Sequence, residues 1–156
     1  EERLEGLHTA LAALKPILKD HGLIGCVEPL GFVECSLRRK AEAIAAIDAV
    51  GGKNRFKVTH DTFHHFVSGE QEVFPERTAL VHVSGVSDRN YTVDTMRDAQ
   101  RALVDAEDMV DNRGQVRKLM AGGCKGFVSF EPFAKAVHSD KAIARSLARS
   151  MDYLEA

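Results

Sequence analysis

Two similar stretches decide the fold, LIGCVEP at residues 23–29 and GFVSFEP at residues 126–132. Each is a short run, too brief for a helix, that ends in Glu-Pro. The first is a continuous apolar run bounded by glycine and proline, which is typical of a strand buried on both faces of a parallel sheet. Proline restricts the residue before it to extended backbone. Both glutamates are therefore expected to keep strand geometry as their strands end.

Two further apolar runs lie between these stretches, and the segments that join them have the three-and-four spacing of helices with one buried face. Residues 85–111 are polar and charged with little periodicity, which predicts a long loop with one short helix near residues 94–101. Long loops inside compact domains are usually functional. The sequence predicts strands at residues 23–27, 56–61, 78–83 and 126–130, and helices at residues 1–20, 37–50, 112–121 and 140–154.

Helices and strands alternate in this order, which predicts right-handed βαβ units over a parallel sheet. A closed (β/α) barrel uses eight strands and about 250 residues. An α/β chain of 156 residues with four expected strands is therefore predicted to form half of such a barrel, as one partial unit over residues 1–156. The chain starts on a helix and without methionine, so we expect either that residues before Glu1 are missing or that two half-barrels associate.

The composition excludes several classes of protein. Hydrophobic residues make up 44% of the chain and charged residues 28%, as in a soluble globular protein. A net charge of −2 argues against a surface built for nucleic acid or anionic lipid. The sequence has no long apolar run and no signal-peptide pattern, so we expect no membrane span, no export and a cytoplasmic location. Three cysteines without a Cys-x-x-Cys pair argue against a disulfide framework or a thiolate zinc site.

Metal-binding side chains stand at the end of all four expected strands: Glu28, Asp61, His82 and Glu131. Each could be an ordinary solvent-facing residue on its own. Parallel strands separated by helices, however, bring their C-terminal ends to one face, where ligands bind. Together these side chains predict an oxygen-rich site for a divalent cation with an acid/base pair built in. His64, on the turn after Asp61, is close enough in sequence to reach this site.

These residues resemble the xylose-isomerase-like barrel proteins, also known as sugar phosphate isomerases/epimerases, which include ketose 3-epimerases and inosose isomerases and dehydratases. The resemblance covers essentially the whole chain, as the C-terminal half of that barrel, strands five to eight. It rests on VEPLG at residues 27–31, DTFHH at 61–65, HVSGV at 82–86 and GGCKGFVSFEPF at 122–133.

The resemblance implies an isomerase or epimerase of a sugar, sugar phosphate or inosose that works through a metal-stabilised enediolate. The four strand-end residues would hold one divalent ion, most often Mn²⁺, with Mg²⁺, Co²⁺ or Zn²⁺ as alternatives. Of the catalytic pair Glu28 and Glu131, one would act as base and the other as acid. His64 would contact an oxygen of a small polyol or sugar substrate, and Arg89 is the nearest candidate for a second substrate contact.

Two other interpretations remain open. A metal-dependent nuclease of the endonuclease IV type shares the barrel, but it would need further His and acidic ligands for a multi-zinc cluster and a basic face for DNA. The acidic balance of this chain argues against it. The other interpretation is a non-catalytic half-barrel that serves as a subunit or binding module and retains the site without turnover.

Overall fold

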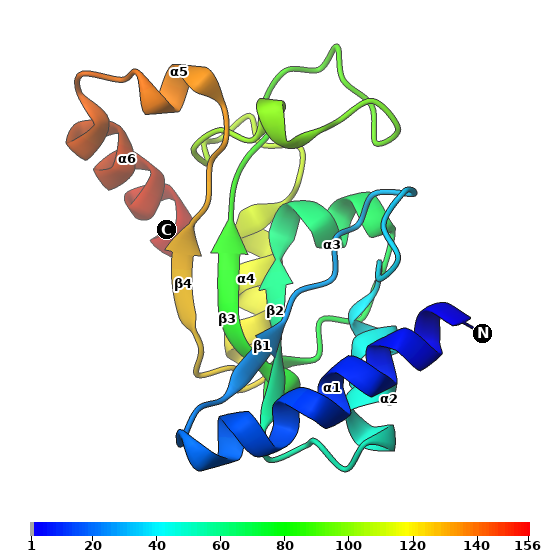
Figure 1. The fold of residues 1–156 in the computed structure, drawn as a ribbon. Coiled ribbons are helices and arrows are strands. Elements are labelled where there is room, and N and C mark those ends of the chain that lie inside the picture. The colour runs from blue at the N-terminus through cyan, green and yellow to red at the C-terminus, as the bar shows by residue number, and fades with distance from the viewer. Residues whose placement is uncertain (1) are drawn as a thin grey trace.

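The computed structural model of the protein describes residues 2–156 and contains one parallel four-stranded sheet in the order β1-β2-β3-β4 (Figure 1). Every neighbouring pair of strands is parallel. Parallel strands in sequence order, separated by outer helices, are the arrangement of half a (β/α)8 barrel, which confirms the predicted fold class. The strands are β1 (Gly25–Val27), β2 (Phe56–Asp61), β3 (Thr78–Val83) and β4 (Phe127–Phe130).

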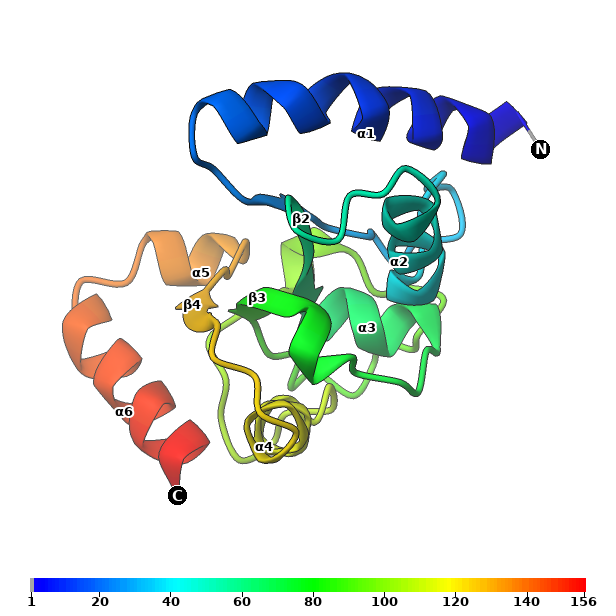
Figure 2. The same cartoon turned by 90° about the horizontal axis from the view of Figure 1, so that it is seen from below.

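The helices form an arc around the strands when the molecule is seen from below (Figure 2). None of the helices within residues 2–156 is both long enough and apolar enough to cross a membrane. The helices are α1 (Glu2–Asp20), α2 (Lys40–Ala49), α3 (Thr62–Ser68), α4 (Asn112–Ala121), α5 (Lys135–His138) and α6 (Ile143–Glu155).

Two helices begin later than their periodicity predicts. α2 starts at Lys40 instead of residue 37, because the carbonyl of Leu37 accepts a hydrogen bond from the N–H of Leu30 (3.0 Å) and stays in the preceding loop. α6 starts at Ile143 instead of residue 140. There the carboxylate of Asp140 accepts hydrogen bonds from the N–H of Ala142, the N-cap residue, and from Oγ of Ser146, which keeps Asp140 in the turn before the helix. In both cases a contact outside the helical pattern sets the first residue.

The long loop after β3 lacks the helix expected near residues 94–101 and has only a 3₁₀ turn at Asp98–Gln100. Gly85 and Ala102 form an antiparallel bridge, with N–H to carbonyl distances of 2.9 and 2.8 Å. This pairing draws the chain into extended geometry and folds the end of the loop back against the beginning. Met96 is buried in a small core shared with α3, so the loop is anchored to the domain.

The outer face of the sheet carries the main core. In β2 and β3 the side chains of Val58, Val81 and Val83 are fully buried. Val58 packs with α1 and α2 residues such as Leu11 and Ile47, whereas the two β3 valines pack in a second cluster that includes residues of α4 and α6. Strand side chains alternate between faces, so Thr59 and Asp61 of β2 and their partners Leu80 and His82 of β3 point toward the inner face. The helices thus leave the inner face for the functional side chains.

The two edge strands are more exposed than the sequence predicts. The expectation that residues 23–27 are buried on both faces is wrong, because Ile24 and Cys26 are exposed. On β4, Phe127 is 83% exposed. Within residues 2–156, no strand pairs with the outer edge of β1 or of β4. The continuous apolar pattern of these strands therefore fits a sheet that would extend beyond both edges.

A buried ion pair joins α2 to the turn after α3. The Glu70 carboxylate accepts hydrogen bonds from Lys40 Nζ (2.8 Å) and from the backbone N–H groups of Lys40 (3.1 Å) and Ala41 (2.9 Å). The side chains of Lys40 and Glu70 are only 4% and 7% exposed. Because no side chain at the N-cap residue of α2 satisfies these N–H groups, Glu70 caps this helix from a separate segment of the chain.

We expect the Glu70→Gln substitution to lower the free energy of unfolding by about 3–5 kcal/mol, because Lys40 would keep a buried charge without an opposite charge. Burial raises the pKa of Glu70, but contacts with His65 and Lys40 outweigh this effect and lower it from 4.5 to about 2. A carboxylate whose pKa is lower in the folded state stabilises the protein at higher pH. Its contribution is therefore lost as the pH falls from 4.5 to about 2.

Urea unfolding of both proteins between pH 7 and pH 2 measures both effects. The wild-type protein should lose stability across this acidic window, and the Glu70→Gln protein should lose less. Arg3→Gln is the matched control, since it breaks a surface ion pair. In this pair the side chain of Arg3 is 44% exposed and that of Glu42 is 32% exposed. Such surface pairs contribute about 0–1 kcal/mol. Equal stability of the two variants would show that the buried pair does not stabilise the fold.

Candidate metal centre

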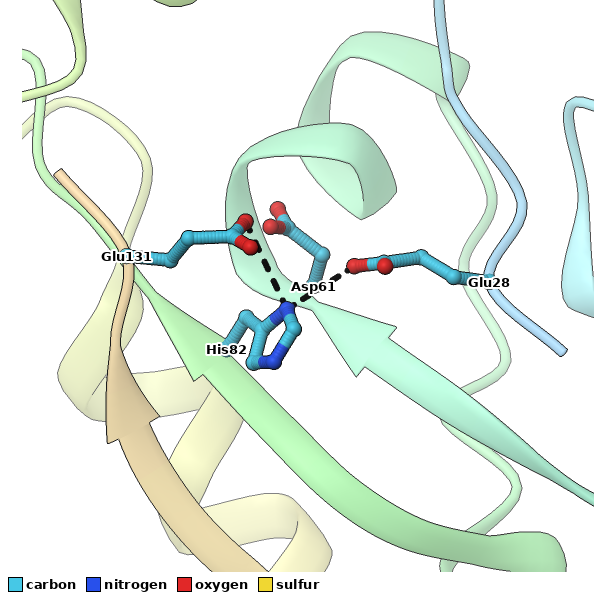
Figure 3. A group of neighbouring side chains, drawn as sticks. All are labelled: Glu28, Asp61, His82 and Glu131. Atoms are coloured by element: carbon cyan, nitrogen blue, oxygen red, sulfur yellow. Dashed lines mark hydrogen bonds and ion pairs between the residues drawn. The ribbon is translucent and has the colours of Figure 1, made fainter. Parts of the chain in front are cut away.

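The four strand-end side chains converge on one point above the sheet (Figure 3). Asp61 is the last residue of β2, His82 the last but one of β3, and Glu28 and Glu131 directly follow β1 and β4. One ligand atom of each residue lies within 4.8 Å of the corresponding atoms of the other three. The structure thus brings together all four residues for which the sequence predicts metal binding.

Strand register explains this convergence. Asp61 and His82 are direct partners in the β2–β3 ladder. The N–H of Glu131 donates to the carbonyl of Val83 (3.0 Å), which extends the β3–β4 ladder one residue beyond the strand. Pro132, which follows, favours the same extended backbone. The Glu-Pro pair thus holds the glutamate at the level of the other ligands, as its sequence predicts.

His82 lies between the two glutamates. Its Nδ1 is 2.9 Å from Glu28 Oε1 and 3.4 Å from Glu131 Oε2. The hydrogen bond with Glu28 raises the pKa of His82. Burial raises the pKa of Glu28, but the hydrogen bond and charge of His82 outweigh burial and lower it. The pKa of Glu131 is raised, because burial outweighs the effect of its cationic neighbours. The two glutamates therefore differ in proton affinity.

Asp61 is buried, and both of its carboxylate oxygens have partners. Oδ1 accepts a hydrogen bond from the N–H of His64 (2.9 Å), which caps the N-terminus of α3. Oδ2 lies 2.5 Å from Nη2 of Arg101, and the same nitrogen lies 2.8 Å from Oε2 of Glu131. Burial raises the pKa of Asp61, and the charge of Arg101 opposes that rise. A guanidinium group thus bridges two of the four candidate ligands.

Sequence reasoning missed Arg101, which lies 19 residues beyond His82 in the long loop. The pairing of Gly85 with Ala102 brings this part of the loop back beside Ser84. The signal in the sequence is the apolar run from 102 to 104, which directly follows Arg101. An arginine just before a buried run in a functional loop is a candidate for an inward position.

The two residues expected to contact substrate lie in different places, His64 beside the cluster and Arg89 outside it. His64 is buried beside the cluster, with Nε2 3.4 Å from Nη1 of Arg101. Burial and the charge of Arg101 lower the pKa of His64 to about 4, so its imidazole is neutral at neutral pH. Arg89 lies outside the cluster, where its side chain is 69% exposed and its nearest acidic group is Glu107, at 3.9 Å. The geometry therefore does not favour Arg89 as a contact in this arrangement.

The donor set fits a divalent cation. Three carboxylates supply hard oxygen ligands, and one imidazole supplies a nitrogen ligand. Carboxylate oxygens suit Mg²⁺ and Mn²⁺, whereas imidazole combined with carboxylates also suits Zn²⁺. With one ligand atom from each residue, Glu28, Asp61, His82 and Glu131 would together provide four protein ligands.

Comparison with known proteins identifies the family and the fold. The chain matches the xylose isomerase-like TIM barrel family over residues 1–155. A xylose isomerase domain-containing protein from Salmonella typhimurium is 32% identical, with a TM-score of 0.87 over 96% of this chain and 57% of that chain. The IolI protein with a bound zinc atom is 15% identical, with a TM-score of 0.79 over 97% of this chain and 55% of that one.

A third similar structure is the 3-keto-D-glucoside 4-epimerase YcjR from E. coli, which is 15% identical with a TM-score of 0.68. The match covers 95% of this chain and 51% of the epimerase. This chain thus spans somewhat more than half the length of these structures. No protein of curated function matches the chain. The resemblance predicted from the sequence motifs is confirmed: the chain belongs to the xylose isomerase-like TIM barrel family.

Proposed function

We propose that this chain carries the metal centre of an isomerase or epimerase that moves a proton on a sugar, sugar phosphate or inosose. The observation that supports the proposal is the convergence of three carboxylates and one imidazole at the C-terminal ends of the strands (Figure 3). Structures of the same fold include a zinc-binding protein and a sugar epimerase. At 15% identity these two support the fold, and the site residues support the chemistry.

A bound divalent ion would polarise the substrate carbonyl and stabilise the enediolate formed when the neighbouring proton is removed. We assign Mn²⁺ as the first candidate ion, with Mg²⁺, Co²⁺ and Zn²⁺ as the alternatives. The protein would provide the four ligands Glu28, Asp61, His82 and Glu131, which fix the position of the ion on the inner face of the sheet.

Glu28 and Glu131 approach His82 from opposite sides, and they would transfer the proton (Figure 3). One of the two would act as the base and the other as the acid on the opposite face of the substrate. Return of a proton to the opposite face of the same carbon would give epimerisation, and return to the neighbouring carbon would give isomerisation.

We assign His64 as a contact for a substrate oxygen, since its neutral imidazole lies beside the ligands. A contact from Arg89 would require its loop to move, because its guanidinium group lies near Glu107 at the surface. The substrate would be a small polyol with adjacent carbonyl and hydroxyl oxygens, because two such oxygens can chelate one ion. No nucleic acid or membrane partner is part of the proposal.

A second candidate function is a half-barrel that binds metal and ligand as a subunit without turnover. Exposed apolar side chains on β4 and just before β1, such as Phe127 and Ile24, favour association with another β/α unit. That unit would be either a second copy of this chain or the other half of a barrel. In this case the substrate pocket would be complete only after association.

The experiment that separates these functions uses the purified chain, stripped of metal and reloaded with Mn²⁺. We expect about one ion per chain by elemental analysis and Mn²⁺-dependent incorporation of deuterium from D₂O into a ketose or an inosose, measured by NMR. Stoichiometric binding without exchange on any of these compounds would favour the binding subunit. Absence of bound metal would contradict the proposed metal centre, and several zinc ions with DNA cleavage would favour a nuclease.

A further inference from the structure

Arg101 is a buried cation within the group of candidate ligands. Its Nη2 lies 2.5 Å from Asp61 Oδ2 and 2.8 Å from Glu131 Oε2, and its side chain is 1% exposed. Hydrogen bonds between a guanidinium and a carboxylate are among the strongest in proteins. One nitrogen thus contacts two carboxylates that are also expected to bind the metal ion.

The rest of the side chain is held in place. Nε of Arg101 donates to Oγ of Ser84 (2.8 Å), and Nη1 donates to Oδ1 of Asp98 (3.0 Å). The guanidinium carbon lies 5.1 Å from the ring centre of Phe63 and 4.8 Å from that of Phe133. Movement to solvent would break all of these contacts. The positive charge is therefore a fixed part of the site.

The charges of the site add up to those that one divalent ion requires. Glu28, Asp61 and Glu131 contribute −3 when ionised and Arg101 contributes +1, which leaves −3 + 1 = −2. One divalent ion together with a neutral His82 would bring the total to zero. The carboxylate of Asp98 also contacts Arg101, but it is 48% exposed, so water screens its charge.

We infer that Arg101 is a resident cation of the metal centre, which stabilises the carboxylates in the absence of an ion and limits the site to one divalent ion. The inference rests on the proposed metal centre and concerns how that centre is regulated. Since the guanidinium bridges Asp61 and Glu131, a second ion could not bridge the same oxygens. Arg101 is in this respect a positioning residue that acts through the two carboxylates.

The inference predicts that Arg101→Gln increases metal affinity. Without the guanidinium, the carboxylates repel one another until an ion binds, and the ion no longer meets a fixed positive charge. We expect the Kd for Mn²⁺, measured by isothermal titration calorimetry at pH 7.5, to fall by at least about tenfold. The unfolding temperature in EDTA should fall, and Mn²⁺ should raise it by more than in the wild-type protein. A merely structural role would weaken Mn²⁺ binding instead.

Two further variants serve as controls. Arg101→Lys keeps the positive charge and should bind Mn²⁺ with nearly the wild-type Kd. Arg97→Gln removes an arginine of the same loop that is 51% exposed and pairs with Glu34 outside the cluster, so it should leave the Kd unchanged. A Kd for Arg101→Gln that equals or exceeds that of the wild-type protein would overturn the inference.

If Arg101→Gln does not fold in EDTA, refolding is repeated with Mn²⁺ present. Recovery of the folded protein would support the inference, because the ion then replaces the lost charge. Failure to recover would overturn it. Lack of Mn²⁺ binding by the wild-type chain would instead contradict the proposed function, so the two failures are distinguishable.

Discussion

Replacement of Glu131 by glutamine is expected to lower the rate of deuterium exchange on a keto-polyol by roughly 10²–10⁴-fold, the range for loss of a proton-transferring group. An amide of the same shape neither donates nor accepts the transferred proton. The substitution also removes one of the two charged partners of Arg101 Nη2 and a charged neighbour of His82. Exchange is measured by NMR at saturating Mn²⁺, so that weaker ion binding does not account for the loss.

The control for this variant is Glu155→Gln, an exposed glutamate at the end of α6. It should exchange deuterium at the wild-type rate. A Glu131→Gln protein that retains exchange within tenfold of the wild-type rate at saturating Mn²⁺ would remove Glu131 from the proton-transfer step. The same exchange measurement on Glu28→Gln would then show whether Glu28 transfers the proton.

The second large effect is expected on metal binding. The paired substitution Glu28→Ala and His82→Ala removes two of the four ligand atoms and their mutual hydrogen bond of 2.9 Å. Loss of an outer partner of a metal ligand already costs 10–100-fold in affinity. We therefore expect loss of two ligands to weaken Mn²⁺ binding by more than about a hundredfold in calorimetry.

Glu5→Ala with His21→Ala is the matched control, since it also removes one glutamate and one histidine, both exposed and located on or next to α1. This protein should bind Mn²⁺ with the wild-type affinity. Equal Mn²⁺ binding by both double variants would show that the ion is not held by the strand-end residues. Circular dichroism of both proteins ensures that the comparison is between folded chains.

The strands and the clustered side chains could be predicted from the sequence because their signals are local. β2 and β3 have the predicted bounds. The convergence of Asp61 and His82 follows from a rule of geometry, because neighbouring parallel strands end at the same edge of a sheet. No knowledge of distant contacts was needed for either.

The remaining features depend on contacts between distant parts of the chain. Arg101 reaches Asp61 across 40 residues, and Glu70 caps the residues that begin α2 from 30 residues away. The hydrophobic periodicity around Arg101 or Glu70 does not indicate which distant residue each side chain contacts. The exposure of Phe127 is a third case, because an apolar strand looks the same in sequence whether its neighbour is present or not.

The sheet also has a consequence for how such proteins diversify. All four strand-end side chains belong to adjacent strands of one sheet, and the outer edges of β1 and β4 have no strand partner within residues 2–156. Recombination of genes at either edge would transfer the four candidate ligands together, along with Arg101.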